Sequence, residues 1–275
     1  MEMIEFYWPN ILAAVILVFV LGMVGRHMVA RNQSMEVMLL GQEFQTSILM
    51  AALVFSTIET QEHSDHGIHL EMFLSLFFVL IYHGFYLLII NKFRQYRIEG
   101  AILSIIMLMG FGQFIVLLSP LVEMHMVKSY LGDIVTVSKT ESLTLAGLVF
   151  LFFIFLNSMK KKVELDTIEI ALFNKVTKKR KSQLQFSIIV LILMLLSIHL
   201  FGSLFTMGAI IIPAFIAGFS RLSQKQYVAM TVINSLSVVG AFMMLTQFDR
   251  VPTTIFILFS IFLISMTYSI ILKKS

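Results

Sequence analysis

The sequence has 275 residues, of which 58% are hydrophobic and only 13% are charged, with a mean hydropathy of +0.91. Because soluble globular domains carry about 25% charged residues, this composition excludes a soluble domain and favours one bundle of membrane helices. The absence of cysteine excludes disulfide bonds and thiolate metal sites, and the net charge of +4 becomes informative only when the charges are placed along the chain.

The apolar runs have the length of about 20 residues that a helix needs to span a bilayer core. They predict nine transmembrane helices, at about 8–27, 38–58, 70–90, 100–120, 142–159, 184–201, 202–220, 227–247 and 253–272. Only Gly202 and Ser203 separate the sixth span from the seventh, so eight spans remain an alternative. The first residues are acidic and lack the basic region of a signal peptide. We therefore expect a single all-α, polytopic membrane domain over residues 1–275.

The basic residues predict the orientation, because cytoplasmic loops carry an excess of lysine and arginine. With the loop 160–183 in the cytoplasm, the inner side collects 17 of the 20 basic residues, and the outer side keeps Lys128, Lys139 and Arg250. This partition predicts a multi-pass membrane protein with its N-terminus outside and its C-terminus in the cytoplasm, and the resemblance described below implies that the membrane is the bacterial inner membrane. Acidic residues gather outside, where they either attract cations or simply occupy positions from which lysine is excluded.

Polar residues inside the predicted spans are candidates for function, because an ionisable group is costly in lipid. The second span contains Gln42 and Glu43, the third contains His83, the fourth Gln113 and the sixth His199. Glu43 is a candidate ligand on a cation path, although it lies near the inner end of its helix. For the two histidines, packing against a neighbouring helix is the simpler interpretation.

The outer loop between the second and third spans concentrates metal-binding side chains. It reads STIETQEHSDHGIHLEM and contains His63, Asp65, His66 and His69 among further carboxylates. Imidazole and carboxylate groups so close together can supply three or four ligands to a transition metal, and imidazole favours zinc over calcium or magnesium. The alternative is a solvated polar loop that binds nothing specific.

The cytoplasmic loop KKKVELDTIEIALFNKVTKKRKSQLQ predicts a short helix over Asp166 to Leu172. Asp166 is a plausible N-cap, with Glu169 three residues later, and Asn174 can end the helix in a left-handed conformation. Such a helix either docks on a partner protein and transmits rigid-body motion, or lies with its basic exit against anionic lipid headgroups.

Several segments resemble the permease subunits of bacterial zinc and manganese ABC transporters. The family's outer Gly-Asp-Ile-Leu-x-Val-Ser stretch is similar to YLGDIVTVS at 130–138, and its gate helix, ending in Leu-Ile-Ile-Pro-Ala, is similar to GSLFTMGAIIIPAFIAGF with Pro213 and Ala214. Weaker similarities are GMVGRHMVARNQ after the first span, RIEGAILS at the fourth, and the cytoplasmic loop. The segments keep their order over about 22–220.

The sequence departs from the family pattern in the second span. The family opens that span with Gly-Asp-x-x-Ser-His, whose Asp and His are thought to lie on the metal path, whereas this chain has Gln42, Gln45 and Thr46 at the three polar positions. The fourth span keeps Glu99 but has Gly100 where the family usually has Asp. Neutral amide and hydroxyl oxygens are poor zinc ligands, so a transported metal would need other ligands.

The resemblance implies a type II ABC importer-like permease for zinc or manganese. It implies a homodimer in membrane lipid, a separate ABC ATPase that docks on Asp166, Glu169, Ala171, Leu172 and Asn174, and an extracytoplasmic solute-binding protein. No P-loop or catalytic motif is found, so we expect no enzyme activity, no permanently bound cofactor and no nucleic-acid partner. The alternatives are an ATPase-independent metal transporter and a metal-sensing membrane protein that uses the outer histidines.

Overall fold

The computed structural model describes residues 2–58, 66–92, 97–118, 137–173, 181–245 and 253–274, and these ranges are helical apart from short turns. The helices are α1 (Glu2–Ala30), α2 (Ser34–Ile58), α3 (His66–Lys92), α4 (Arg97–Leu118), α6 (Lys139–Ser158), α7 (Lys160–Phe173), α8 (Lys181–Phe201), α9 (Ser203–Ser220), α10 (Gln224–Leu245) and α11 (Thr253–Lys274). Within these ranges, eight helices are long and apolar enough to cross a membrane, and α3 contains a shorter apolar stretch, Phe73–Tyr86. The prediction of an all-α, polytopic bundle with eight or nine spans is confirmed.

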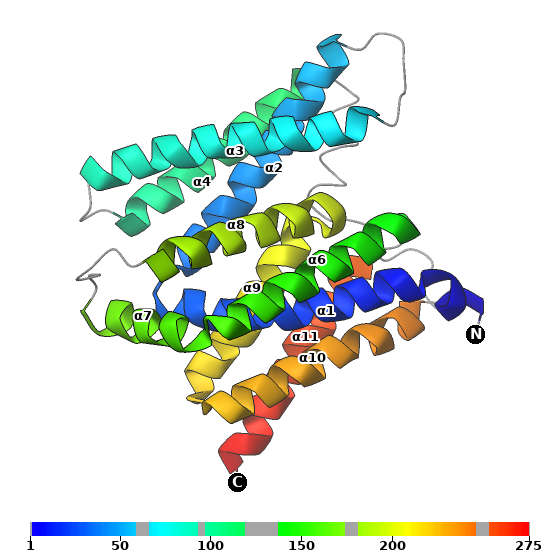
Figure 1. The fold of residues 1–275 in the computed structure, drawn as a ribbon, viewed down its shortest axis with the longest axis vertical. Coiled ribbons are helices and arrows are strands. Elements are labelled where there is room, and N and C mark those ends of the chain that lie inside the picture. Colours follow the sequence, from blue (N-terminus) through cyan, green and yellow to red (C-terminus); the bar gives the residue numbers. More distant parts are fainter. Residues whose placement is uncertain are drawn as a thin grey trace.

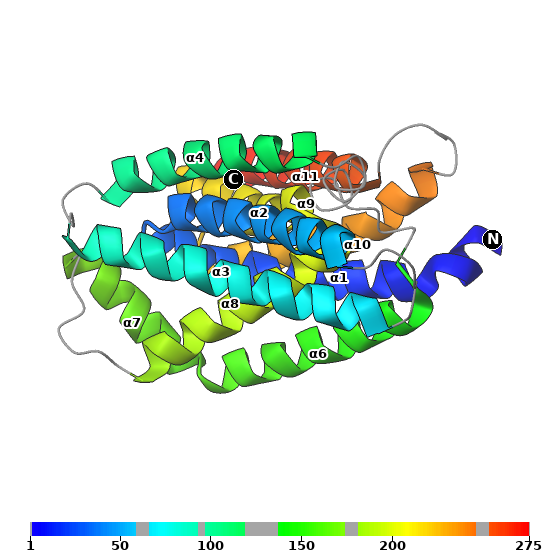
Figure 2. The ribbon, with the colours of Figure 1, turned by 90° about the horizontal axis from the view of Figure 1, so that it is seen from above.

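Helix α1 is at the centre of the main bundle, where it packs against α6, α9 and α10 (Figure 1). Helix α2 runs from the end of α1 to α3 and α4, which form a separate layer at the top of Figure 1. Figure 2 shows that most of the long helices run roughly side by side. In the α2 span 72% of the residues are buried, compared with 17% in the α4 span, so α2 belongs to the interior and α4 presents most of its apolar surface outward.

One end of the bundle, which we call the α7 end, carries α7 and many of the described basic residues. Here α1, α3, α6, α9 and α11 end, and α2, α4, α8 and α10 begin. The arginines and lysines at these helix ends are Arg26, Arg31, Lys92, Arg97, Lys160, Lys161, Lys162, Lys181, Arg221, Lys225, Lys273 and Lys274. The alternation of helices that the sequence predicted is therefore present in the structure.

Close packing around α1 depends on glycine. A Cβ atom on Gly25 would lie 2.0 Å from the carbonyl oxygen of Ile210 in α9, and one on Gly22 would lie 2.7 Å from a methyl group of Thr231 in α10. The buried hydroxyl of Tyr227 donates a hydrogen bond to the carbonyl oxygen of Gly22. Since lipid tails are as apolar as leucine, membrane helices associate through such close contacts and interhelical hydrogen bonds.

The junction between α8 and α9 consists of a single residue, Gly202, whose φ of 85° is in the region that favours glycine. The two helices are joined beside it by the hydroxyl groups of Ser197 and Thr206, which lie 2.5 Å apart, and Thr206 also donates to the carbonyl oxygen of Gly202. The predicted break between the sixth and seventh spans is therefore present.

Candidate functional site

Glu43 and His83 form a hydrogen-bonded pair between α2 and α3. The Nδ1 atom of His83 lies 3.0 Å from Oε2 of Glu43, and the two side chains are 23% and 1% exposed. Glu43 lies nine residues after the start of α2 and His83 nine residues before the end of α3. At 1.5 Å per residue, both are therefore about 13 Å from the α7 end, well inside a hydrocarbon core about 30 Å thick.

Ser47 and Tyr86 lie beside this pair. Ser47 donates to the carbonyl oxygen of Glu43 at 2.6 Å, and the ring of Tyr86 lies 5.9 Å from that of His83. A carboxylate and an imidazole are two ligands of the kind that zinc and manganese accept. Among the described residues no group of three or more His, Cys, Asp or Glu side chains is positioned to hold a metal. The pair offers two ligands, and a metal bound there would have to take its further ligands from water or another chain.

Gln42, Gln45 and Thr46 stand at the three polar positions that differ from the family pattern. Their side chains form hydrogen bonds within α2 or to the neighbouring helix α4. Gln42 donates to Gln45 at 3.1 Å, and Thr46 donates to the carbonyl oxygen of Leu108 in α4 at 3.4 Å. In this structure the three side chains therefore make contacts within α2 and between α2 and α4.

The outer histidine cluster lies largely outside the described residues. His63 and Asp65 belong to the undescribed segment 59–65, while His66 and His69 are in the first turn of α3 with side chains that are also outside the description. Their role in metal binding stays a prediction.

Helix α7 is longer than predicted and is fixed to the bundle by one face. It begins at Lys160, so the prediction that Asp166 is the N-cap is wrong. Asp166 lies in the helix interior, is 3% exposed and accepts a 2.6 Å hydrogen bond from Ser182 at the start of α8. This carboxylate is therefore engaged within the bundle, and the predicted coupling role of Asp166 stays a prediction. Glu169 is half-buried, Ala171 and Leu172 are exposed, and Asn174 lies outside the described residues.

Thr167 connects α7 to the end of α1. Its hydroxyl donates to the carbonyl oxygen of Val163 at 2.7 Å and lies 3.1 Å from Nε of Arg31 and 3.0 Å from Nδ1 of His27. Because a hydroxyl has one proton and two lone pairs, Arg31 and His27 both donate to it. Burial lowers the pKa of the Arg31 guanidinium to about 10, and the nearby Asp166 carboxylate opposes this shift.

The guanidinium of Arg31 is further held over the ring of Phe186 in α8, 4.4 Å from its centroid. Sequence reasoning found the segment that contains Arg31 but missed this junction of α1, α7 and α8. A basic residue after a span is usually solvated, and its burial is visible only once α7 is placed.

The opposite face of α7 is apolar and exposed. Leu165, Ile168 and Leu172 are 59%, 55% and 71% exposed, and their spacing of three and four residues places them on one side of the helix. Sequence reasoning had selected only Leu172 of these three.

The buried polar pair, the apolar spans and the basic α7 end define a multi-pass helical membrane protein. Comparison with solved structures matches this chain to "PsaBC from Streptococcus pneumoniae in complex with Fab", with a TM-score of 0.66 and 13% sequence identity over 96% of this chain and 89% of that chain. The chain therefore shares its fold with a chain of that solved structure. No family model and no curated protein matches the sequence.

Proposed function

We propose that this chain is the membrane-spanning permease subunit of an ABC importer for a divalent metal ion, zinc or manganese, driven by a separate ATPase subunit. The shared fold and the family-like segments over about 22–220 support this proposal. The observation that carries it is the exposed apolar face of α7, which is the feature that an ATPase-coupled permease needs and a channel does not.

Helix α7 is suited to transmit force. Its outer face offers Leu165, Ile168 and Leu172 to a groove on the ATPase, and its inner face is fixed to α1 through Thr167 and to α8 through Asp166. A movement of the docked ATPase would therefore displace the ends of α1 and α8 together with α7, as a rigid-body motion. In this proposal the α7 end lies in the cytoplasm, the N-terminus is outside and an extracytoplasmic binding protein delivers the metal.

The ion path of the proposed importer uses Glu43 and His83 in place of the family's Asp and His. Two copies of the chain form the permease, and the metal passes along the α2–α3 interface of each copy, where Glu43 and His83 supply one oxygen and one nitrogen ligand. Of the two metals we favour zinc, because imidazole is a good zinc ligand. The imidazole groups are those of His83 in this pair and of His63, His66 and His69 in the outer segment.

The coupling role of α7 is tested by Leu172→Arg in the permease reconstituted with its ATPase. A bulky cation at this position cannot enter an apolar groove, so we expect ATP hydrolysis to lose its dependence on the permease and uptake to fall at least about tenfold, which corresponds to about 1.4 kcal/mol of lost docking. Ala171→Arg should act in the same direction.

The matched control is Ile98→Arg, which places arginine on another exposed apolar side chain near the α7 end, in α4. It should retain coupling. Wild-type ATPase stimulation in the Leu172→Arg protein would show that α7 is an interfacial helix and would contradict the proposal.

A further inference from the structure

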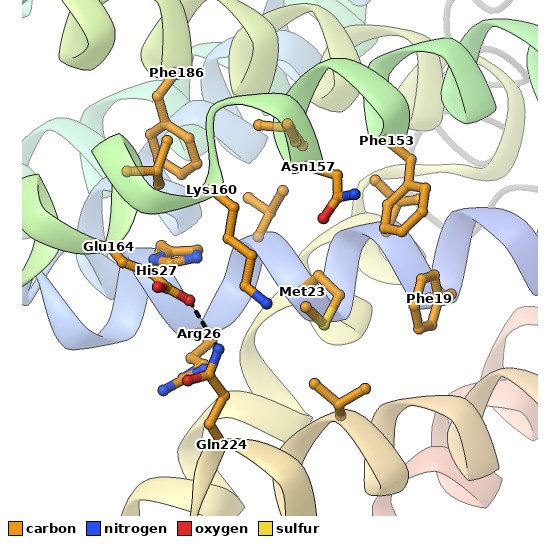
Figure 3. Close-up of a pocket in the computed structure, with 15 residues that line it drawn as sticks. Phe19, Met23, Arg26, His27, Phe153, Asn157, Lys160, Glu164, Phe186 and Gln224 are labelled. Carbon is orange, nitrogen blue, oxygen red and sulfur yellow. Dashed lines mark hydrogen bonds between the residues drawn. The ribbon is translucent and has the colours of Figure 1, made fainter.

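A pocket of about 230 Å³ lies at the α7 end, on the side of α1 that faces α6, α7 and α10. Helices α6 and α10 both pack along α1 without packing extensively against each other, so the pocket lies between them. Figure 3 shows polar side chains on one side of it, among them Arg26, Glu164 and Gln224, and the rings of Phe19 and Phe153 on the other. The pocket is therefore amphipathic.

The polar side carries an excess of positive charge. Arg26 comes from α1 and Lys160 from the first position of α7, and Figure 3 shows Lys160 extending across the pocket towards Met23. Within the ranges that the structure describes, no carboxylate forms an ion pair with either cation. The carboxylate of Glu164 accepts a 2.8 Å hydrogen bond from Gln224 in α10. This side of the pocket therefore has two cations, Arg26 and Lys160, and one carboxylate that is already hydrogen-bonded. The net positive charge makes it suitable for binding an anion.

The apolar side lies deeper along the helices. Phe19 precedes Arg26 by seven residues in α1, which places their Cα atoms about 10 Å apart along the helix at 1.5 Å per residue, and Phe153 of α6 lies beside Phe19. The two rings form an edge-to-face contact with their centroids 5.3 Å apart. Polar and apolar sides thus follow one another along the bundle axis, as the headgroup and acyl chains of a lipid do.

The volume favours partial insertion of a larger molecule. A cavity of about 150 Å³ holds one benzene, and pockets that enclose a drug-sized molecule measure about 300–1,000 Å³. A pocket of 230 Å³ is therefore large enough for the first part of an acyl chain and too small for a complete amphiphile, whose remainder would stay in the bilayer.

We propose that this pocket binds one anionic phospholipid of the adjacent leaflet, with its phosphate between Arg26 and Lys160 and the start of one acyl chain against Phe19 and Phe153. Basic pockets between transmembrane helices on the cytoplasmic side bind anionic headgroups in this manner. The lipid would contact α1, α6, α7 and α10 at once and so join the ATPase-docking helix to the bundle.

The test measures lipid preference by fluorescence quenching. The sequence has one tryptophan, Trp8, so a Trp8→Phe, Phe153→Trp protein carries a single reporter in the pocket. In phosphatidylcholine vesicles that contain phosphatidylglycerol, brominated phosphatidylglycerol should displace brominated phosphatidylcholine from the reporter with at least about tenfold preference. Arg26→Gln/Lys160→Gln should reduce this ratio to near one.

The matched control is Lys162→Gln/Lys225→Gln, which removes two exposed lysines from α7 and α10 that do not line the pocket. This protein should keep the preference. Native mass spectrometry of the chain without the reporter substitutions should show one retained phosphatidylglycerol that the Arg26→Gln/Lys160→Gln variant loses.

If both double variants lost the phosphatidylglycerol preference to the same extent, the lipid would be attracted only to the basic surface in general. That result would overturn the proposal. Binding of inorganic phosphate, lost in Arg26→Gln/Lys160→Gln and without any phosphatidylglycerol preference, would assign the pocket to a soluble anion and would also overturn it.

Discussion

Gly25→Ala tests the close crossing of α1 and α9. The new methyl group would lie 2.0 Å from the carbonyl oxygen of Ile210 and 2.9 Å from its carbonyl carbon. Because real Cβ atoms essentially never approach other atoms closer than 3.0 Å, the two helix backbones must separate by at least about 1 Å. A backbone carbonyl cannot rotate away as a side chain can.

Overpacking of this kind costs about 1–3 kcal/mol. Alanine gains about 1 kcal/mol over glycine in a helix interior, so the comparison needs a glycine with free space. A methyl group added to Gly147 in α6 would meet no atom within 4 Å, and Gly147→Ala should therefore be neutral or stabilising. The two substitutions are chemically identical, so the gain in helix propensity cancels and they should differ by the overpacking cost of about 1–3 kcal/mol in stability.

Thermal unfolding in detergent, followed by size-exclusion chromatography, measures this difference. One kcal/mol shifts the midpoint by about 2–4 °C in a chain of 150–250 residues, so Gly25→Ala should melt at least about 2 °C below Gly147→Ala. Equal midpoints would refute the argument, because they would mean that α1 and α9 accommodate the methyl group without separating.

Three further predictions address α7, the orientation and the outer histidines. Thr167→Val leaves the buried donors of Arg31 and His27 without their shared acceptor and should destabilise the protein by about 1–3 kcal/mol, whereas Thr144→Val, which removes only an exposed hydroxyl bonded within its own helix, should melt like the wild type. In intact cells a single cysteine at position 139 should react with an impermeant reagent and one at position 162 should not; labelling at 162 would reverse the orientation. Replacing His63, His66 and His69 together with alanine should reduce zinc uptake at limiting zinc and much less at high zinc, and wild-type binding should weaken below a pH of about 6.5 as the imidazoles are protonated; unchanged uptake would identify a solvated loop.

Local signals in the sequence were sufficient to predict the helices. Apolar length gives the spans, and the capping box formed by Ser138 and Glu141 at the start of α6 follows from neighbours in the sequence. Even the break at Gly202 could be predicted, because a single glycine permits the φ of 85° that two nearly continuous helices require.

Tertiary contacts were the part that local signals could not reveal. Asp166 has the residue type and the spacing of an N-cap, yet it accepts a hydrogen bond from Ser182, 16 residues away. The pairing of Glu43 with His83 joins residues 40 positions apart. The sequence does show that the two residues lie equally far from the basic ends of their helices. Two residues at the same depth need not be in neighbouring helices, however, so the pairing could not be predicted.

Glu43 has different partners from the polar residues beside it in α2. Glu43 is one residue beyond Gln42, and one residue rotates a helical side chain by about 100°. Gln42 contacts Gln45 and Thr46 contacts α4, whereas Glu43 meets His83 in α3. A metal that uses Glu43 must follow the α2–α3 interface.

This reasoning predicts the outcome of restoring the family residues. Glu43→Gln should abolish metal uptake, because it removes the anionic ligand, while Glu36→Gln, which changes an acid in the first turn of the same helix, should have little effect. Adding Gln42→Asp and Thr46→His to the Glu43→Gln protein should fail to restore uptake, since Gln42 contacts Gln45 and Thr46 contacts Leu108 of α4, and neither contacts His83. Recovery of uptake in the triple variant, measured with radioactive zinc or manganese in proteoliposomes, would show that the ion follows the face of residues 42 and 46. Glu43 and His83 would then be a structural pair that fastens α3 to α2.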